Sequence, residues 1–295
     1  MSKETCDILI NNALVMNPDF SFSRDTSIAI RDKRILKIGK DLQQSHQAEE
    51  TLDGRNRLAM PGLIDGHTHL SQQLLRGMIS DEYPIIYQRF NLPLESKLTR
   101  EEVALSVKLG CLEMIRSGTT SFADAGSTHM DAFVESVEES GLRATVTRST
   151  SDTGEFLPAE MVDTTREGLR ESEEFFRTYH NRGDGRIRAW FQYRSMASAT
   201  DELIVGLTEM AREYDTGVHT HISEYSESVL YAQRTHQMRE IEYLDRLGVM
   251  GKNLLAAHCL LISENDIRIL AESGTKVVHC PRSNLGKAVS KTPSL

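Results

Sequence analysis

Two histidines one residue apart, His67 and His69, are the first feature of the sequence that could carry out chemistry. They lie in the segment PGLIDGHTHL, residues 61–70, at the end of a short apolar run. Side chains two residues apart on a strand point to the same side, so both imidazoles should project together. Imidazole nitrogens bind zinc at about 2.0–2.1 Å, which makes the pair a candidate metal site. The competing interpretation is a surface turn that contains two unrelated histidines.

Four further histidines lie at or next to the ends of other predicted strands. His219 and His221 lie in GVHTH, His258 ends NLLAAH, and His279 lies in KVVHC. The carboxyl ends of barrel strands share one face, where the active sites of that fold lie. Histidines of a hydrophobic core would scatter along the elements, so this placement favours one shared metal site. No role is assigned to the other four histidines, which are His46, His129, His180 and His236.

Glu224 follows His221 by three residues and is the candidate acid–base. A metal lowers the pKa of its bound water to about 7. A nearby carboxylate can take the released proton and deliver it to a leaving nitrogen. The alternative is an ordinary surface glutamate in the polar segment SEYSE.

The alternation of apolar and polar stretches after residue 60 predicts repeated strand–helix units. Helical patterns begin at the capping residues Thr99, Thr200 and Ser263. Buried parallel strands between such helices indicate an α/β fold, either a doubly wound sheet or a TIM-like (β/α)8 barrel with about seven strands present. The candidate strands lie at 60–66, 119–124, 143–148, 187–191, 217–221, 253–258 and 276–280.

Residues 6–60 alternate apolar and polar side chains and show no long helical pattern, which predicts a small antiparallel β unit. We therefore expect two parts, residues 1–60 and a (β/α) barrel over residues 61–295. The last residues, KAVSKTPSL, are interpreted as the start of a further helix.

Composition and charge narrow the classes of partner. The formal net charge is −9, which disfavours nucleic acid and anionic membranes. No apolar run approaches the roughly 20 residues of a membrane span, and the first residues do not resemble a signal peptide. The four cysteines form no CxxC pair and no disulfide framework, so the cytoplasm is the expected compartment.

Five segments, in this order, resemble the amidohydrolase superfamily: PGLIDGHTHL, CLEMIRSGTTSFAD, HTHISE, AAHC and VVHCPRSNL. The resemblance is closest to the branch of S-adenosylhomocysteine/methylthioadenosine deaminases, guanine deaminases and s-triazine hydrolases, and it extends from about residue 6 to the end. It implies a (β/α)8 barrel and a composite β-sandwich to which residues 1–60 contribute. It also implies one divalent metal, Zn²⁺ before Fe²⁺, a small heterocyclic substrate, and a possible homo-oligomer.

The resemblance assigns roles at the metal site residue by residue. His67 and His69 match the metal ligands of the first strand, and His221 matches the ligand of the fifth. Glu224 matches the acid–base, and His258 matches the histidine that orients the water or the substrate. His219 is outside the usual ligand set and is treated as a supporting or structural residue.

Three other residues match positions near the substrate. Arg148 corresponds to a substrate contact of the adenosine-type members, and His279 lies in the segment that borders their substrate pocket. Arg194, in YRSMASAT, stands where those members carry a substrate-contacting histidine. The segment YPIIYQRFNLPLE also lacks the Glu-Trp pair of the nucleoside binders. Adenosine-type substrates are therefore less favoured.

The family's remaining metal ligand is an aspartate at the end of an eighth strand, and no such motif precedes Leu295. We interpret the chain as part of a longer enzyme, with an inactive metal-binding remnant as the alternative. The predicted activity is hydrolytic deamination of an aminopurine, a cytosine or a nucleoside-like heterocycle. The alternative within enzymes is s-triazine dechlorination or another C–N hydrolysis on the same scaffold.

Overall fold

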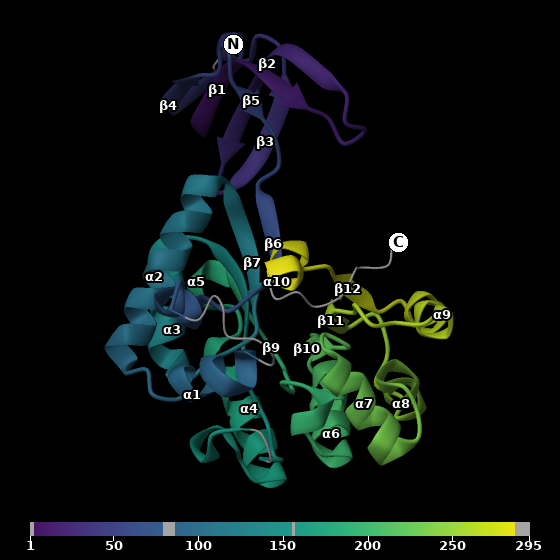
Figure 1. Ribbon diagram of the computed structural model, residues 1–295. Coiled ribbons are helices and arrows are strands. Elements are labelled where there is room, and N and C mark those ends of the chain that lie inside the picture. Colours follow the sequence, from purple (N-terminus) through teal and green to yellow (C-terminus); the bar gives the residue numbers. More distant parts are fainter. Residues whose placement is uncertain (1–2, 79–85, 155–156, 287–295) are drawn as a thin grey trace. The chain divides into compact units, whose positions relative to one another are not determined.

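The computed structural model describes residues 3–78, 86–154 and 157–286 (Figure 1). Residues 287–295, where the sequence suggested a further helix, lie outside these ranges. The chain divides into two compact units, Met1–Gly62 and Leu63–Leu295, which are described separately.

The first unit is a five-stranded sheet with the order β3-β2-β1-β4, and β5 pairs with β1. The prediction of an antiparallel unit is correct for β1, β2 and β3 but wrong for β4 and β5, which run parallel to β1. Because β2 already occupies one edge of β1, the returning chain pairs with the other edge after a short 3₁₀ turn, Leu42–Gln44. The strands are β1 Glu4–Met16, β2 Phe22–Arg31, β3 Arg34–Gly39, β4 His46–Asp53 and β5 Leu58–Ala59.

The second unit contains seven parallel strands among its described residues, which confirms the predicted barrel-type α/β fold. β6 to β9 form one ladder and β10 to β12 form another. Isolated parallel bridges, Phe191 with Val218 and Ser195 with His221, connect the two ladders. The strands are β6 Leu63–Thr68, β7 Thr119–Asp124, β8 Arg143–Thr147, β9 Ile187–Trp190, β10 Val218–Ile222, β11 Leu254–His258 and β12 Lys276–Val278.

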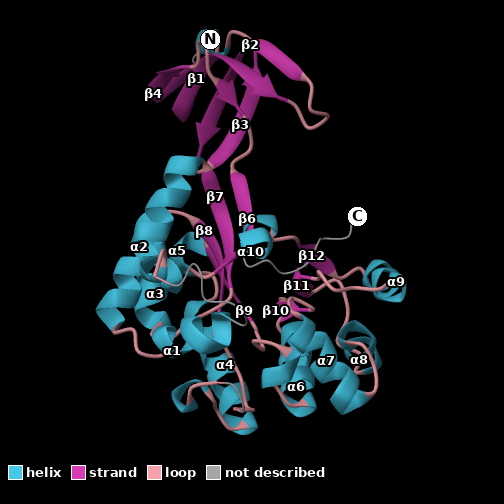
Figure 2. Cartoon of the chain, viewed as in Figure 1, coloured by secondary structure: helices cyan, strands magenta, loops and turns pink. Residues whose placement is uncertain are grey.

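Helices follow the strands of this unit, with α2 against β7 and α6 against β10 (Figure 2). None of the described helices is long and apolar enough to cross a membrane. The helices are α1 Leu92–Glu95, α2 Arg100–Ser117, α3 Met130–Ser140, α4 Thr165–Tyr179, α5 Arg182–Gly185, α6 Asp201–Glu213, α7 Ser226–His236, α8 Glu240–Arg246, α9 Glu264–Ser273 and α10 Pro281–Gly286. Shorter helical turns are Leu70–Leu75, Tyr87–Asn91, Ala159–Met161 and Met196–Ser198.

The three predicted helix starts are confirmed by their caps. The hydroxyls of Thr99, Thr200 and Ser263 each accept a hydrogen bond from a backbone N–H in the first turn of α2, α6 and α9. A cap of this kind stabilises a helix by about 1 kcal/mol, because it satisfies an N–H that has no partner within the helix.

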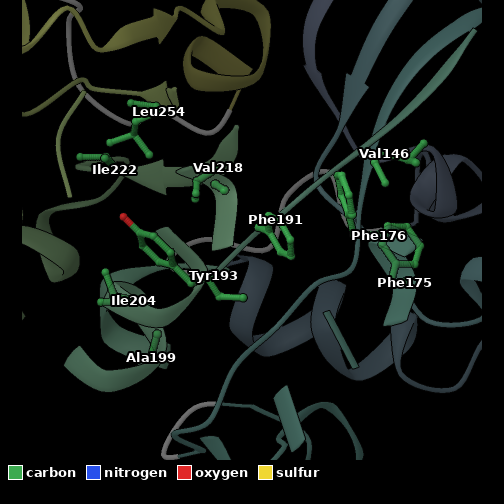
Figure 3. Packing of buried hydrophobic residues seen from close by; sticks show 14 of the residues in the cluster. Val146, Phe175, Phe176, Phe191, Tyr193, Ala199, Ile204, Val218, Ile222 and Leu254 are labelled. Atoms are coloured by element: carbon green, nitrogen blue, oxygen red, sulfur yellow. The ribbon is translucent and has the colours of Figure 1, made fainter. Parts of the chain in front are cut away.

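The buried side chains of the strands pack against the helices and hold the strand ends in place. Phe191, which follows β9, is 1% exposed, and its ring stacks on Phe176 of α4 with centroids 5.3 Å apart. Figure 3 shows these two rings together with Val146, and Tyr193 near Ile204. Close packing of this kind gives the frame from which the polar residues project.

Gly126, just after β7, occupies a left-handed turn (φ +74°) with no room for a side chain. A Cβ placed there would lie 2.5 Å from the Ser149 nitrogen and 2.7 Å from the Thr147 oxygen. Gly126→Ala should therefore reduce the free energy of unfolding by more than the roughly 1–2 kcal/mol that a left-handed alanine costs alone. Gly141→Ala is the matched control in urea unfolding, because Gly141 shares the backbone conformation (φ +78°) and has open space around it. Equal losses in the two variants would contradict this explanation.

Candidate metal centre and substrate cavity

The structure brings five of the six predicted strand-end histidines into one cluster. His67 lies in β6, His69 follows that strand, His219 and His221 lie in β10, and His258 ends β11. The ring centroid of His67 lies between 4.8 and 5.1 Å from those of the other four. Residues 67 and 258 are 191 positions apart in sequence, so only the parallel strands explain the gathering.

The spacing of the ring nitrogens fits a single metal ion. The Nε2 atoms of His69 and His221 are 3.1 Å apart. Two nitrogens bound at about 2.0–2.1 Å to one tetrahedral ion would be about 3.3 Å apart. The potential ligand atoms of His67, His221 and His258 lie within 4.8 Å of one another. The cluster can therefore hold one divalent metal.

Hydrogen bonds set the orientation of two of these rings. Nδ1 of His221 lies 2.8 Å from the Arg194 carbonyl oxygen, and Nδ1 of His258 lies 3.0 Å from Oδ1 of Asn284. Both oxygens accept, so each Nδ1 carries the hydrogen and each Nε2 keeps its lone pair. Partners of this kind fix the tautomer of a metal ligand and raise its basicity.

Three histidines of the cluster are held neutral by their surroundings. Burial, with a smaller effect of the neighbouring histidines His221, His69, His219 and His258, lowers the pKa of His67 well below its usual value. Burial also lowers the pKa of His221 to about 3 and that of His219 to about 4. Neutral imidazole is the form that binds a metal, so near pH 7 these rings need no deprotonation.

Glu224 lies at the edge of this cluster. Its Oε2 is 3.5 Å from Nε2 of His258, and the residue is buried (8% exposed). It follows β10 after a single residue, Ser223. A carboxylate in this position can exchange a proton with a group that sits between it and the histidines.

A cavity of about 260 Å³ opens from the cluster. Six of the eight predicted site residues line it, namely His67, His69, His221, His258, Glu224 and Arg194. The rings of Tyr87 and Tyr225 stack on each other at 5.0 Å and form one wall. The polar lining also includes Thr68, Gln72, Gln88, Asn91, Thr153, Ser195, Ser198, Ser228 and Ser283.

The structure does not place Arg148 and His279 among the described residues that line this cavity. The Arg148 guanidinium forms ion pairs with Asp163, at 2.8 Å, and Glu171, at 2.6 Å, and borders a different cavity. His279 is exposed and borders an open groove that runs between β6 and β12. The sequence correctly predicted that both residues lie near the end of a strand, but it did not predict the direction of their side chains.

Several residues that support the site were not predicted from the sequence. Asn284 orients His258, and Glu95 is fully buried beside the Arg194 guanidinium, at 3.3 Å. Asp124, at the end of β7, accepts hydrogen bonds from the backbone nitrogens of Leu70 and Gly126. Burial raises the pKa of Asp124 to about 7. Asn284 and Asp124 lie inside quoted motifs, but nothing in a sequence distinguishes a buried polar side chain from an exposed one.

Comparisons with known proteins point to one family. Residues 58–292 match the model of the amidohydrolase family. A 5′-deoxyadenosine deaminase of Methanobrevibacter smithii is 34% identical over 289 residues, which is 97% of this chain and 64% of that protein. A 5-methylthioadenosine/S-adenosylhomocysteine deaminase of Thermoanaerobacter pseudethanolicus is 31% identical over 291 residues, with 65% of its length covered. The chain thus spans somewhat less than two thirds of the length of these curated relatives.

Solved structures share the fold. An adenosine deaminase from Xanthomonas campestris with bound zinc superimposes with a TM-score of 0.89 at 27% identity, over 98% of this chain and 65% of that one. A triazine hydrolase from Arthrobacter aurescens has a TM-score of 0.89 at 22% identity, over 97% of this chain and 68% of that one.

Proposed function

This chain belongs to the amidohydrolase family, and on that premise we propose that it is part of a metal-dependent hydrolytic deaminase acting on an exocyclic amine of a nitrogen heterocycle. The observation that carries the proposal is the convergence of neutral imidazoles and the Glu224 carboxylate at one end of the cavity. The deaminase names of the relatives support the reaction class.

His67, His69 and His221 are the residues that would hold the metal, for which we propose Zn²⁺. When bound, the metal would supply a water whose pKa is lowered to about 7. Glu224 takes a proton from the attacking water and delivers it to the departing nitrogen. The new C–O bond forms at the carbon that carried the amine, the C–N bond breaks with its electron pair on nitrogen, and ammonia leaves.

His258 acts beside Glu224 in this scheme. Its Nδ1–H is held by Asn284, so its Nε2 is turned toward the space that it shares with the Glu224 carboxylate. We assign it the orientation of the water and of the substrate atom under attack. Tyr87 and Tyr225 offer a flat wall on which a heterocycle can stack.

Arg194 is the residue we propose to orient the heterocycle. Its side chain is 9% exposed and donates to Ser149 Oγ, at 3.0 Å, and to Glu95 Oε2. A guanidinium carries five N–H donors, and these contacts account for two of them. A ring nitrogen or carbonyl oxygen of the substrate is the acceptor that suits the others. Arg148 and His279 stay candidates only for contacts outside the cavity.

Removing the Arg194 guanidinium should raise KM by roughly 10–100-fold, because a hydrogen bond to a charged group contributes about 1.5–3 kcal/mol. Arg194→Met alone would leave the buried Glu95 carboxylate without its cation, which is itself strongly destabilising. The variant to measure is therefore Arg194→Met with Glu95→Gln, and Glu95→Gln alone is its control. Equal KM values for the double variant and this control would show that Arg194 does not contribute to substrate binding.

The reaction class is tested by ammonia release. The zinc-loaded chain is incubated with aminopurines, cytosines, aminotriazines and 5′-deoxyadenosine, and ammonia is measured with a coupled assay. We expect release from at least one of these classes. No release from any of them by protein that holds one equivalent of metal would contradict the proposal, and chloride release from a chlorotriazine would replace it with dechlorination.

A further inference from the structure

The turn that carries Glu224 has a backbone conformation that most residues avoid. Ser223 has φ 49°, and in the adjacent turn after β11 His258 has φ 76° and Cys259 has φ 47°. None of the three is glycine. Left-handed residues of this kind persist only where the surroundings hold them, and they concentrate at functional sites.

All the polar groups of Ser223 are engaged. Its backbone nitrogen and its hydroxyl both donate to Oε2 of Glu240, at 2.7 and 3.1 Å. Its carbonyl oxygen accepts from the backbone nitrogens of Leu260, at 3.1 Å, and Leu261, at 3.2 Å. The Glu224 turn is thus fixed from one side by a carboxylate and from the other by the turn that follows His258.

Glu240 is itself firmly anchored. It is the first residue of α8 and is 2% exposed. The preceding residue, Arg239, donates to the Asp266 carboxylate at 2.6 Å and to the Leu261 carbonyl oxygen, which ties the start of α8 to the same turn. Among the described residues, the hydrogen bonds to the Glu240 carboxylate come from Ser223.

A buried carboxylate is a costly way to hold a turn. Burial raises the pKa of Glu240 to about 7, and the Ser223 donors oppose that rise. An apolar side chain at this position would avoid the desolvation of a charge. It would also leave the amide and the hydroxyl of Ser223 without their acceptor, so what accounts for the carboxylate is the pair of convergent donors on the residue next to Glu224.

We propose that Glu240 is a positioning residue, which holds Ser223 in its left-handed conformation and so directs the Glu224 carboxylate at the histidine cluster. This inference rests on the acid–base role proposed for Glu224. Both Ser223 donors meet one oxygen, so the amide oxygen of glutamine can accept them equally well, while leucine cannot.

The test compares Glu240→Gln with Glu240→Leu. We expect Glu240→Gln to keep kcat within about threefold, and Glu240→Leu to lower kcat roughly 10–100-fold with KM and zinc content little changed. Such a loss corresponds to a misplaced acid–base, whose correct placement contributes about 10²–10⁴-fold. Glu264→Leu is the matched control, since Glu264 is the first residue of α9 and is exposed.

A second variant separates positioning from simple folding. Glycine accepts the left-handed conformation without strain, so adding Ser223→Gly to Glu240→Leu should restore thermal stability but not kcat. Recovery of both would show that Glu240 serves the fold alone and would overturn the proposal. Wild-type kcat in Glu240→Leu would overturn it as well.

Hydrogen exchange supplies a readout that does not depend on turnover. The amide of Ser223 should exchange at least tenfold faster in Glu240→Leu than in the unchanged chain, and at the unchanged rate in Glu240→Gln. Identical exchange in the unchanged chain and in both variants would show that Glu240 does not hold Ser223 in place. Failure of the unchanged chain to release ammonia would count against the proposed function. The exchange result would then still decide whether Glu240 holds Ser223 in place.

Discussion

Glu224→Gln is expected to lower kcat by about 10²–10⁴-fold, the range attributed to a positioned general acid–base. Glutamine preserves the shape of the side chain but can neither take the proton of the attacking water nor deliver one to the leaving nitrogen. The Oε2 atom lies 3.5 Å from His258 Nε2, so the substitution acts where the reaction is proposed to occur. Steady-state ammonia release measures the effect, with KM expected to change far less than kcat.

Glu227→Gln is the matched control for this prediction. Glu227 lies three residues further on, in the first turn of α7, and is exposed. It should retain the kcat of the unchanged chain. If Glu224→Gln were as active as Glu227→Gln, the carboxylate would have no part in proton transfer.

The second large effect is expected when one proposed metal ligand is removed. His221→Ala should weaken zinc binding by more than 100-fold, since loss of a mere supporting partner of a ligand already costs about 10–100-fold. The Nε2 atom that the substitution deletes lies 3.1 Å from that of His69. Competition with a chromophoric chelator measures the dissociation constant.

His236→Ala serves as the control for zinc affinity. His236 is at the end of α7, and its ring stacks on Tyr243 at 3.6 Å instead of joining the cluster. Its loss should leave zinc affinity unchanged. Equal zinc affinities of His221→Ala and His236→Ala would show that the ion binds elsewhere in the chain.

The fold of the second unit could be predicted from the sequence because the patterns that mark its strands and helices are local. Alternating apolar strands and capped helices mark each element, and each candidate strand overlaps the observed one, as 119–124 does with β7. The strand ends then place the histidines on one face by topology alone. The mixed sheet of the first unit was not predicted, because the choice of edge for β4 depends on which edge β2 has already taken.

Side-chain direction and burial account for what the sequence could not supply. Arg148 and Arg194 both follow strands, β8 and β9, yet the first pairs with Asp163 and the second lines the cavity. Glu95 and Glu240 are charged residues at the ends or starts of short helices, where sequence patterns predict an exposed position. Their burial depends on contacts that are distant in sequence. Glu95 contacts Arg194, which is 99 positions away, and Glu240 contacts Ser223, which is 17 positions away.

We propose that the five clustered histidines at the strand ends form one metal centre that faces the cavity. Anomalous diffraction at the zinc absorption edge, from crystals of the zinc-loaded chain, tests it most directly. We expect a single strong peak within about 2.0–2.1 Å of the ring nitrogens of His69 and His221. A peak at another place in the chain with none at these histidines, or no peak in protein that carries stoichiometric zinc in solution, would contradict it.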